Sequence, residues 1–555
     1  MRPATETKNL FGRCDMRRGT VFVLSVLALV AFGLAAWGEG ERVLRITFAW
    51  PTYIDPAIGS DFSSSSAFVN LYDTLVYPDV NGDPQPHVAV KWEVSEDGTV
   101  WTFYLRDDVY FHDGTPLTAE DVKFSMDRIT TIGQGYGFLF VDRVVKTEVV
   151  DDYTVRFYLK EPFGPFLTTL YRLYIVNKDL VEANIKRPGP YGEWGDYGTE
   201  FLLTHDAGSG PYMVKEFRTE EELVMVKNPD YWLPIPEEAP DVVRFIGTTE
   251  PATIRTMMAR RELEISDQWQ PQEAWKALDA IEGVEITSFF PGTSFYLMLH
   301  TRKPPTDDIH FRRAMAWAFD YETVIRDIFP GSIQSRGPVA QSLPGHDPTV
   351  FQFHRDLDKA REELQKSKYY DQLDQIEVEY HWIAEVPDEE KVALLFMANM
   401  AEIGINVKVV KVPWMSVVEE MAQMETSPNI VSIFVAPHYP EAGSILESRY
   451  HSSSAPTWEQ NEWLLDETFD KMLEDALATV DREERFRKYA ELQHYIVDLC
   501  PSIFLFDQVE KHAYQAAYID WPAARGEVIP VMGYNMAARF IKVYPEKREA
   551  LLKGG

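Results

Sequence analysis

The chain has 555 residues, of which 45% are apolar and 25% are charged, and its formal net charge is −33. A chain of this length is too long for a single hydrophobic core, so we expect two or three globular domains. The strong negative charge repels nucleic acid and anionic lipid headgroups, so we expect neither as a partner.

The N-terminal segment has the layout of a secretory signal peptide. Arg17-Arg18 precede an apolar run over residues 21–34. Ala36 and Gly38 are the small residues at positions −3 and −1 of a signal-peptidase cut after Gly38. We therefore expect residues 1–38 to be removed. The rest of the protein is then extracytoplasmic, in the periplasm or at the cell surface.

Two alternatives are left open at this end of the chain. Met16 directly precedes the arginines, so the true start is either Met1 or Met16. Residues 21–37 also just reach the length of a membrane span, so an uncleaved N-terminal anchor is possible. After the signal segment the chain holds a single cysteine, Cys500, which predicts neither a disulfide framework nor a cysteine metal site.

Strand and helix patterns alternate from residue 42 onward. Residues 42–48 alternate between apolar and polar and predict a strand, and residues 92–105 predict a hairpin that turns at 95–98. Residues 109–111 predict a third, short strand. We expect a helix to begin after Thr118, because Asp121 stands three residues later at N-cap spacing.

The rest of the chain continues in the same way. Residues 63–66 and 452–454 are serine-rich and predict polar loops. Apolar runs predict strands over residues 145–150, 154–159, 263–265, 295–299, 405–409 and 503–506. Helical spacing predicts helices over residues 253–261, 308–319, 358–363, 394–403 and 485–497. Such alternation favours an open α/β sheet in each of two domains.

One long stretch carries a family resemblance. In family 5 solute-binding proteins, the peptide-, nickel- and oligosaccharide-binding receptors of ABC importers, a W-x-x-S-x-D-G-x-x-x-x-F-x-L-R hairpin precedes F-H-D-G-x-P-(L/F)-T-A-x-D-V-x-(F/W)-S. The matching residues here are Trp92, Ser95, Asp97, Gly98, Phe103, Leu105, Arg106, Phe111, His112, Asp113, Gly114, Pro116, Thr118, Ala119, Asp121, Val122, Phe124 and Ser125. Weaker matches, such as Asp55-Pro56 and a helix over 70–75, extend the resemblance over residues 42–506.

The resemblance implies a fold and a division of the chain. The expected fold is α/β, a two-lobed periplasmic-binding-protein fold of type II, similar to cluster C, with an extra subdomain inserted in the first lobe. The expected parts are the signal peptide (1–38), lobe I (39–75, 200–290 and 504–555), the extra subdomain (76–199) and lobe II (291–503). The ligand is then enclosed between the lobes.

The sequence gives no sign of catalytic chemistry. It contains no HExxH, GxSxG or CxxC motif, no phosphate-binding glycine loop, and no pair of histidines at metal-ligand spacing. We therefore expect no enzyme activity, no cofactor and no bound metal. A secreted hydrolase with an unrecognised site is the alternative from another class.

Aromatic residues in loops after strands are the candidate ligand contacts. In open α/β sheets ligands bind beyond the carboxyl ends of the strands, and aromatic rings there stack on sugars or on peptide side chains. The predicted cleft residues are Trp50, Tyr53, Trp269, Trp414, Phe434, His438 and Tyr439. Core packing is the competing explanation for each ring, above all for Trp414 after Pro413.

The ligand class is left open between an oligosaccharide and a peptide-like solute. Oligopeptide-binding members carry W-x-x-D-Y-x-D-P, whose first Asp pairs with the peptide ammonium, and here His438 stands in its place. An imidazole cannot replace that carboxylate, so free-N-terminus recognition is doubtful unless Glu441 substitutes. This departure and the 13% aromatic content favour a sugar. The expected protein is a monomeric receptor that captures an oligosaccharide or peptide-like solute and delivers it to ABC permease subunits, with an oligopeptide receptor proper as the alternative.

Overall fold

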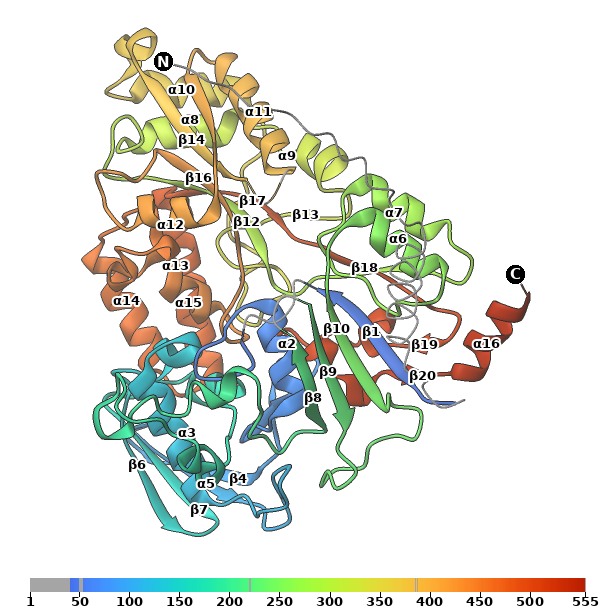
Figure 1. Cartoon of the computed structure of the whole chain (residues 1–555). Helices are drawn as coiled ribbons and strands as arrows, with labels where there is room; N and C mark the ends of the chain where they lie inside the picture. The colour runs from blue at the N-terminus through green and yellow to red at the C-terminus, as the bar shows by residue number, and fades with distance from the viewer. Residues whose placement is uncertain (1–39, 49–52, 219–220, 385, 387, 555) are drawn as a thin grey trace, which may run out of the picture. The chain divides into compact units, whose positions relative to one another are not determined.

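The computed structural model describes residues 40–48, 53–218, 221–384, 386 and 388–554. Its contacts divide the chain into residues 1–41 and residues 42–555. The second unit contains all the sheets and helices discussed below, which are labelled in Figure 1.

Lobe II is built on a six-stranded sheet of order β13-β17-β12-β16-β14-β15. The central strand β12 is buried along its whole length because both of its faces are covered. Phe295, Leu297 and Leu299 belong to one hydrophobic cluster, whereas the alternate residues Tyr296 and Met298 belong to another. The strands are β12 (Ser294–Leu299), β13 (Ile333–Gln334), β14 (Glu377–Ile383), β15 (Asn406–Val412), β16 (Ile430–Val435) and β17 (Ser502–Asp507).

Two groups of helices cover this sheet. The side chains of Phe311, Ala360 and Phe396 join the cluster around Phe295, and those of Leu446, Phe469 and Tyr489 join the cluster around Tyr296. The helices are α8 (Ile309–Ala318), α9 (Tyr321–Thr323), α10 (Leu357–Lys366), α11 (Asp388–Ala401), α12 (Trp414–Met421), α13 (Ala442–Tyr450), α14 (Glu467–Ala478) and α15 (Arg482–Leu499).

Lobe I contains a four-stranded sheet of order β1-β10-β9-β8, in which β1 runs parallel to β10. Residues from both ends of the chain complete this lobe, because β18 pairs with β11 and Val543 N donates to Glu238 O at 2.9 Å. The elements are β1 (Val43–Phe48), α2 (Phe62–Leu71), β8 (Tyr212–Arg218), β9 (Glu222–Lys227), β10 (Val242–Gly247), α6 (Pro251–Ala259), α7 (Gln272–Asp279), β11 (Glu285–Phe289), β18 (Glu510–Tyr514), β19 (Ile519–Asp520), β20 (Lys542–Val543) and α16 (Pro545–Gly554).

The extra subdomain has its own sheet of order β4-β5-β7-β6 and lies beside the ends of α14 and α15 (Figure 1). Gly164 N donates to Leu477 O at 2.7 Å across this contact. The elements are β2 (Val76–Pro78), β3 (Pro84–Pro86), β4 (Ala89–Val94), β5 (Val100–Leu105), α3 (Ala119–Ile132), β6 (Val144–Asp151), β7 (Thr154–Leu159), α4 (Phe166–Thr169) and α5 (Lys178–Ala183). The predicted capping box at Thr118 and Asp121 is present at the start of α3.

The chain passes between the two lobes along two short crossovers. Residues 290–293 connect β11 to β12, and residues 508–509 connect β17 to β18. The crossovers are hydrogen-bonded to each other, since Gln508 N donates to Thr293 O at 2.8 Å. The two lobes are therefore hinged on a paired piece of backbone.

Several sequence predictions are corrected here. Residues 63–66 are not a loop but part of α2, because Asp61 caps the helix and Ser66 Oγ donates back to Phe62 O. The helix expected over 70–75 ends at Leu71, because the backbone of Tyr72 is extended, with φ −130° and ψ 154°. Residues 109–111 form only an isolated bridge between Tyr110 and Pro116, and residues 263–265 pair only at Ile265.

The predicted boundary between residues 503 and 504 falls inside a strand. Tyr296 and Phe504 are register partners in the lobe II sheet, and the pairing continues to Ser294 and Asp507. Because the hydrogen bonds of β17 hold its whole length in that sheet, the strand belongs to lobe II through Asp507. The chain therefore leaves lobe II after Asp507, not after residue 503.

A buried ion pair ties the first loop of lobe I to the extra subdomain. Asp55 and Arg128 are each about 1% exposed, and the guanidinium of Arg128 donates to both carboxylate oxygens of Asp55 at 2.7 and 2.6 Å. Arg128 Nε also donates to Tyr197 O at 2.9 Å. The pair joins three segments that are far apart in the sequence.

We expect Asp55→Ala to destabilise the protein by about 3–5 kcal/mol, because it leaves the buried charge of Arg128 without its partner. Urea unfolding followed by tryptophan fluorescence measures the change. The matched control is Asp327→Ala, which breaks an ion pair to Arg326 whose two side chains are 53% and 57% exposed. That control should change stability by less than about 1 kcal/mol. Equal effects from both variants would contradict the assignment.

A second buried acid makes stability depend on pH. Burial raises the pKa of Glu462 from 4.5 to about 7, and Ser502 Oγ donates to its carboxyl at 2.6 Å. A carboxyl whose pKa is higher in the folded state binds more protons folded than unfolded. Its contribution to stability is thus fully present below pH 4.5 and is lost as the pH rises through 7.

We expect Glu462→Gln to flatten this part of the stability curve. Between pH 4.5 and 7 the rise in pKa corresponds to at most about 3 kcal/mol. Urea midpoints for the parent and the variant, measured at intervals from pH 4.5 to 8, give the difference. A parent and a variant with parallel curves would show that Glu462 does not titrate in this range.

Candidate ligand-binding site between the lobes

One candidate site is a cavity of about 730 Å³ beside the crossover into β18. Proteins usually hold small ligands in cavities of about 300–1,000 Å³. Trp269 and Trp275 line it from lobe I, Phe329 and Phe434 line it from lobe II, and Val509 and Lys511 line it from the crossover and β18. The remaining lining residues are Thr249, Pro251, Gln268, Gln270, Pro271, Gln272, Pro330, Ser332, Val386, Asp388 and Gln508.

A buried acid fixes the loop that carries Trp269. Asp267 is fully buried, and its Oδ1 accepts a hydrogen bond from Trp269 N at 2.9 Å. Gln270 Nε2 donates to Asp267 as well, and Asp267 N bonds to Thr47 Oγ1 at 3.1 Å. Burial raises the pKa of Asp267. With its backbone held in this way, Trp269 leaves its ring 50% exposed.

Phe434 presents the facing apolar wall. It lies near the end of β16 and stands 4.6 Å from Phe295, centroid to centroid, with Phe329 6.0 Å away. Phe506 completes the ring cluster at 6.1 Å from Phe434. Trp269 and Phe434 therefore lie in different lobes but line one cavity, as a ligand that holds the lobes together requires.

Strand β18 separates this cavity from a smaller one. Side chains alternate along a strand, so Val509 and Lys511 line the large cavity while Glu510 lines the small one. His512 follows on the same side as Glu510, and its Nε2 lies 2.8 Å from Glu510 Oε1. The Nζ of Lys511 donates to Pro330 O at 2.6 Å, and burial lowers the pKa of Lys511.

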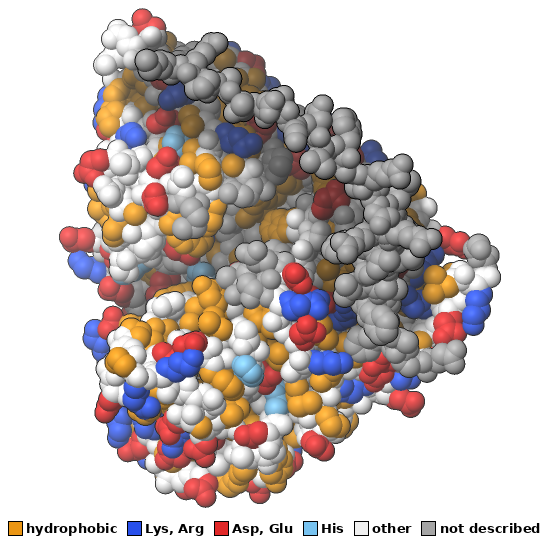
Figure 2. All heavy atoms as spheres, viewed as in Figure 1, with side chains coloured by type: hydrophobic (Ala, Val, Ile, Leu, Met, Phe, Trp, Pro, Cys, Tyr) orange, Lys and Arg blue, Asp and Glu red, His pale blue; other side chains and the backbone are white. Residues whose placement is uncertain are grey.

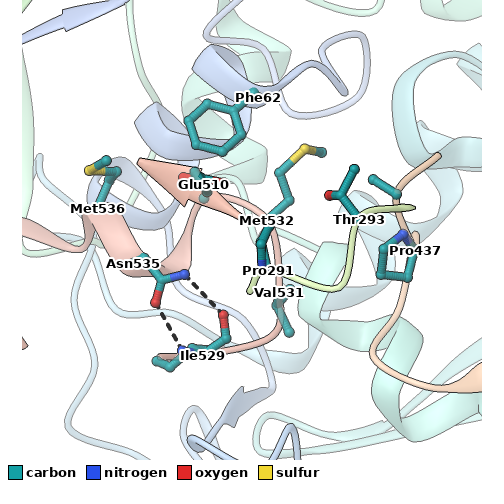
Figure 3. A pocket seen from close by; sticks show the side chains of 12 residues that line it. Phe62, Pro291, Thr293, Pro437, Glu510, Ile529, Val531, Met532, Asn535 and Met536 are labelled. Carbon is teal, nitrogen blue, oxygen red and sulfur yellow. Dashed lines mark hydrogen bonds between the residues drawn. The ribbon is translucent and has the colours of Figure 1, made fainter. Parts of the chain in front are cut away.

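The smaller cavity, of about 40 Å³, is mostly apolar (Figure 3). Phe62, Met532 and Met536 contribute from lobe I, and Pro437 contributes from lobe II. At about 10–15 Å³ for one water molecule, this space holds roughly three waters. It is too small for a ligand of the size that the large cavity admits.

The predicted site residues are not all brought together. Of the seven, Trp269 and Phe434 line the large cavity. Trp414 packs against Trp458 at 5.2 Å, and Tyr53 N donates to Ser64 Oγ at 3.2 Å. Trp50 lies outside the described residues.

His438 and Tyr439 face the extra subdomain. The ring of His438 stands 4.7 Å from that of Phe138, and Tyr439 is 2% exposed with its ring 6.3 Å from Phe163. Both rings therefore pack lobe II against the subdomain. Neither lines the large cavity, so the two residues reach a ligand only by a change in this packing.

Glu441 does not take the place of the missing aspartate. Its carboxylate is 2% exposed and accepts hydrogen bonds from Arg485 Nε at 3.1 Å and Nη2 at 3.0 Å. Tyr489 OH donates to the same group at 3.0 Å. Its oxygens are thus occupied by lobe II itself, and an ammonium ligand would have to displace Arg485.

Sequence reasoning missed Phe329 and the residues of the crossover and β18. The sequence offers one signal for Lys511: it is a charged residue that closely follows the apolar run over residues 503–506 and precedes the buried Ala513. Phe329 follows the turn of a π-helical segment, Val324–Ile328, and no local pattern marks its direction. No sequence pattern marks the glutamines Gln268, Gln270, Gln272 and Gln508 as lining residues.

Acidic and basic side chains are interspersed over the face shown in Figure 2. Within the described ranges no group of three histidine, cysteine, aspartate or glutamate side chains is arranged to hold a metal ion. No helix among the described residues is both long enough and apolar enough to cross a membrane.

Two α/β lobes hinged on two crossovers, with a cavity between them, define the class of substrate-binding receptors of ABC importers. The family model of bacterial extracellular solute-binding proteins, family 5, matches residues 83–456. The chain belongs to this family. Its members are transport receptors without enzymatic activity, which supports the expectation of a binding protein rather than a hydrolase.

Known proteins resemble the chain over most of its length. The "Probable D,D-dipeptide-binding periplasmic protein DdpA" of Escherichia coli is 29% identical over 507 residues, covering 89% of this chain and 94% of that protein. The E. coli "Dipeptide-binding protein" is 24% identical and covers 86% and 91%. A solved structure of the Helicobacter pylori periplasmic binding protein DppA with the peptide STSA has a TM-score of 0.75 at 22% identity, covering 90% and 98%.

We expect Trp269→Ala and Trp275→Ala to separate binding from stability. Trp269 is 50% exposed, so its loss should weaken ligand binding with little change in unfolding free energy. Trp275 also lines the cavity but is only 7% exposed on α7, so its loss should cost about 3–5 kcal/mol of stability in addition to weakening binding. Calorimetric titration and urea unfolding measure the two effects. A Trp269 variant that binds like the parent would place the site elsewhere.

Proposed function

We propose that the protein is an extracytoplasmic receptor that encloses a short peptide or peptide-like solute between its lobes and delivers it to ABC permease subunits. The observation that carries the proposal is the cavity of about 730 Å³, with Trp269 on one lobe and Phe434 on the other. Exclusion of water between two such walls favours the closed form when a ligand fills it. The proposed receptor acts as a monomer after loss of residues 1–38.

Polar groups in the cavity suit a peptide backbone. Gln268 and Gln270 line the cavity with side-chain amides, which can both donate and accept hydrogen bonds. Gln272 and Gln508 line the same space with further amides. Peptide N–H and C=O groups complement such amides.

The comparisons give no support to the sugar preference that composition suggested. The three relatives named above are described as binding dipeptides or are solved with a peptide. The aromatic residues that favoured a sugar are largely core: Tyr439 is 2% exposed, and Trp521 is 1% exposed. A peptide-like ligand is therefore proposed ahead of an oligosaccharide.

We expect di- to pentapeptides to raise the melting temperature of the purified protein. A ligand at 100 times its dissociation constant stabilises the native state by about 2.7 kcal/mol. The screen includes cello-, manno- and xylo-oligosaccharides, and mass spectrometry of co-purifying compounds runs beside it. Shifts with sugars and none with peptides would overturn the proposal. Turnover of a bound compound would overturn the transport role.

A further inference from the structure

The large cavity contains a positively charged side chain that forms no ion pair with any residue the structure describes. Among its lining residues in the described ranges, Lys511 is basic and Asp388 is acidic, and the others are uncharged. Asp388 is already paired, because Lys391 Nζ lies 2.6 Å from its Oδ1. No ion pair of the described residues includes Lys511, in a chain whose net charge is −33.

The ammonium of Lys511 has N–H donors that no hydrogen bond to a described residue uses. A lysine has three N–H donors, and the one hydrogen bond described for Lys511 goes to the backbone oxygen of Pro330 at 2.6 Å. Burial lowers the pKa of Lys511. A half-buried cation without a counter-ion is costly, so the site favours an anion brought by the ligand.

The backbone of lobe II leaves room for this side chain. Gly331 has φ +99°, and a Cβ built there would stand 3.2 Å from Val509 Cγ1 and 3.7 Å from Lys511 Nζ. The lysine thus crosses from β18 to the turn of lobe II at Pro330, where its ammonium is held. An anion that contacts Nζ is bound at the junction of the lobes.

We propose that Lys511 binds a carboxylate of the ligand, so that the receptor recognises a peptide-like solute with a free C-terminal carboxyl group. The inference rests on the proposed function and deepens it. Trp269 and Phe434 line the same cavity with apolar rings. A charge-assisted hydrogen bond is stronger in such surroundings than in bulk water.

The test compares each peptide with its C-terminal amide by calorimetric titration. The parent protein should bind the free acid about 10- to 100-fold more tightly than the amide, the range expected for one charge-assisted contact. Lys511→Met should bind both forms equally, and Lys511→Arg should keep the preference. The control Lys276→Met removes an exposed charge from α7, outside the lining, and should keep it too.

Two further measurements, of melting temperature and of the pH dependence of binding, separate the possible outcomes. The melting temperature of ligand-free Lys511→Met should equal or exceed that of the parent, since removing an unpaired half-buried charge does not destabilise. Binding of the acid by the parent should also weaken as the pH rises through the lowered pKa of Lys511, while binding of the amide should not change.

Equal binding of acid and amide by the parent would overturn the role of Lys511 and leave the peptide function standing. A preference that survives in Lys511→Met would assign the carboxylate to another residue. A lower melting temperature in that variant, with the preference kept, would show that Lys511 only supports the Pro330 turn. Failure of both ligand forms to bind would overturn the proposed function itself.

Discussion

The hydrogen bond from Gln508 N to Thr293 O holds the two crossovers together, and the arrangement of the site depends on it. Each lobe has its own sheet, so the sheets keep their internal order whatever the angle between the lobes. The paired crossovers fix where the lobes meet. They also fix which face of β18 each residue presents, and through that the division between the large and the small cavity.

A second set of contacts also holds the two lobes together. Arg172 is fully buried, and it donates to His438 O at 3.2 Å in lobe II and to Met532 O at 3.0 Å in lobe I. Ion pairs from Arg143 to Glu447 and from Arg482 to Asp83 join the extra subdomain to lobe II. Opening of the lobes must break these contacts, so they and the ligand contribute to the same equilibrium.

The sequence predicted well where a structure is local. The hairpin of β4 and β5 and the capping box of α3 follow from residues within a few positions of each other. Prediction failed where a distant partner decides. The serines of α2 are buried in a packed helix, and residues 263–265 form only isolated bridges, from Ile265 to Ile46 and to Tyr514.

Prediction of the candidate site from sequence is limited in the same way, because contacts between distant residues decide it. Trp269 and Phe434 were found because aromatic residues in or beside predicted loops are easy to recognise. Lys511 was missed because its role comes from the lobe II turn at Pro330, which is 181 residues away. His438 and Tyr439 were assigned to the cleft by resemblance, yet in this structure their rings pack against Phe138 and Phe163 of the inserted subdomain.

The pairing of β1 with β10 constrains the order in which the chain is completed. Val43 is the register partner of Val242, and β11 pairs with β18 near the C-terminus. A ribosome therefore releases most of the polypeptide before lobe I can close its sheets. The partner of β1 is complete once residue 247 has been made, whereas β11 lacks its partner until residue 514 has been made. The nascent chain therefore keeps apolar segments of lobe I available to chaperones late in synthesis. Lobe I of such a protein stays unfolded until late in synthesis. A protein whose first strands pair at once would fold earlier.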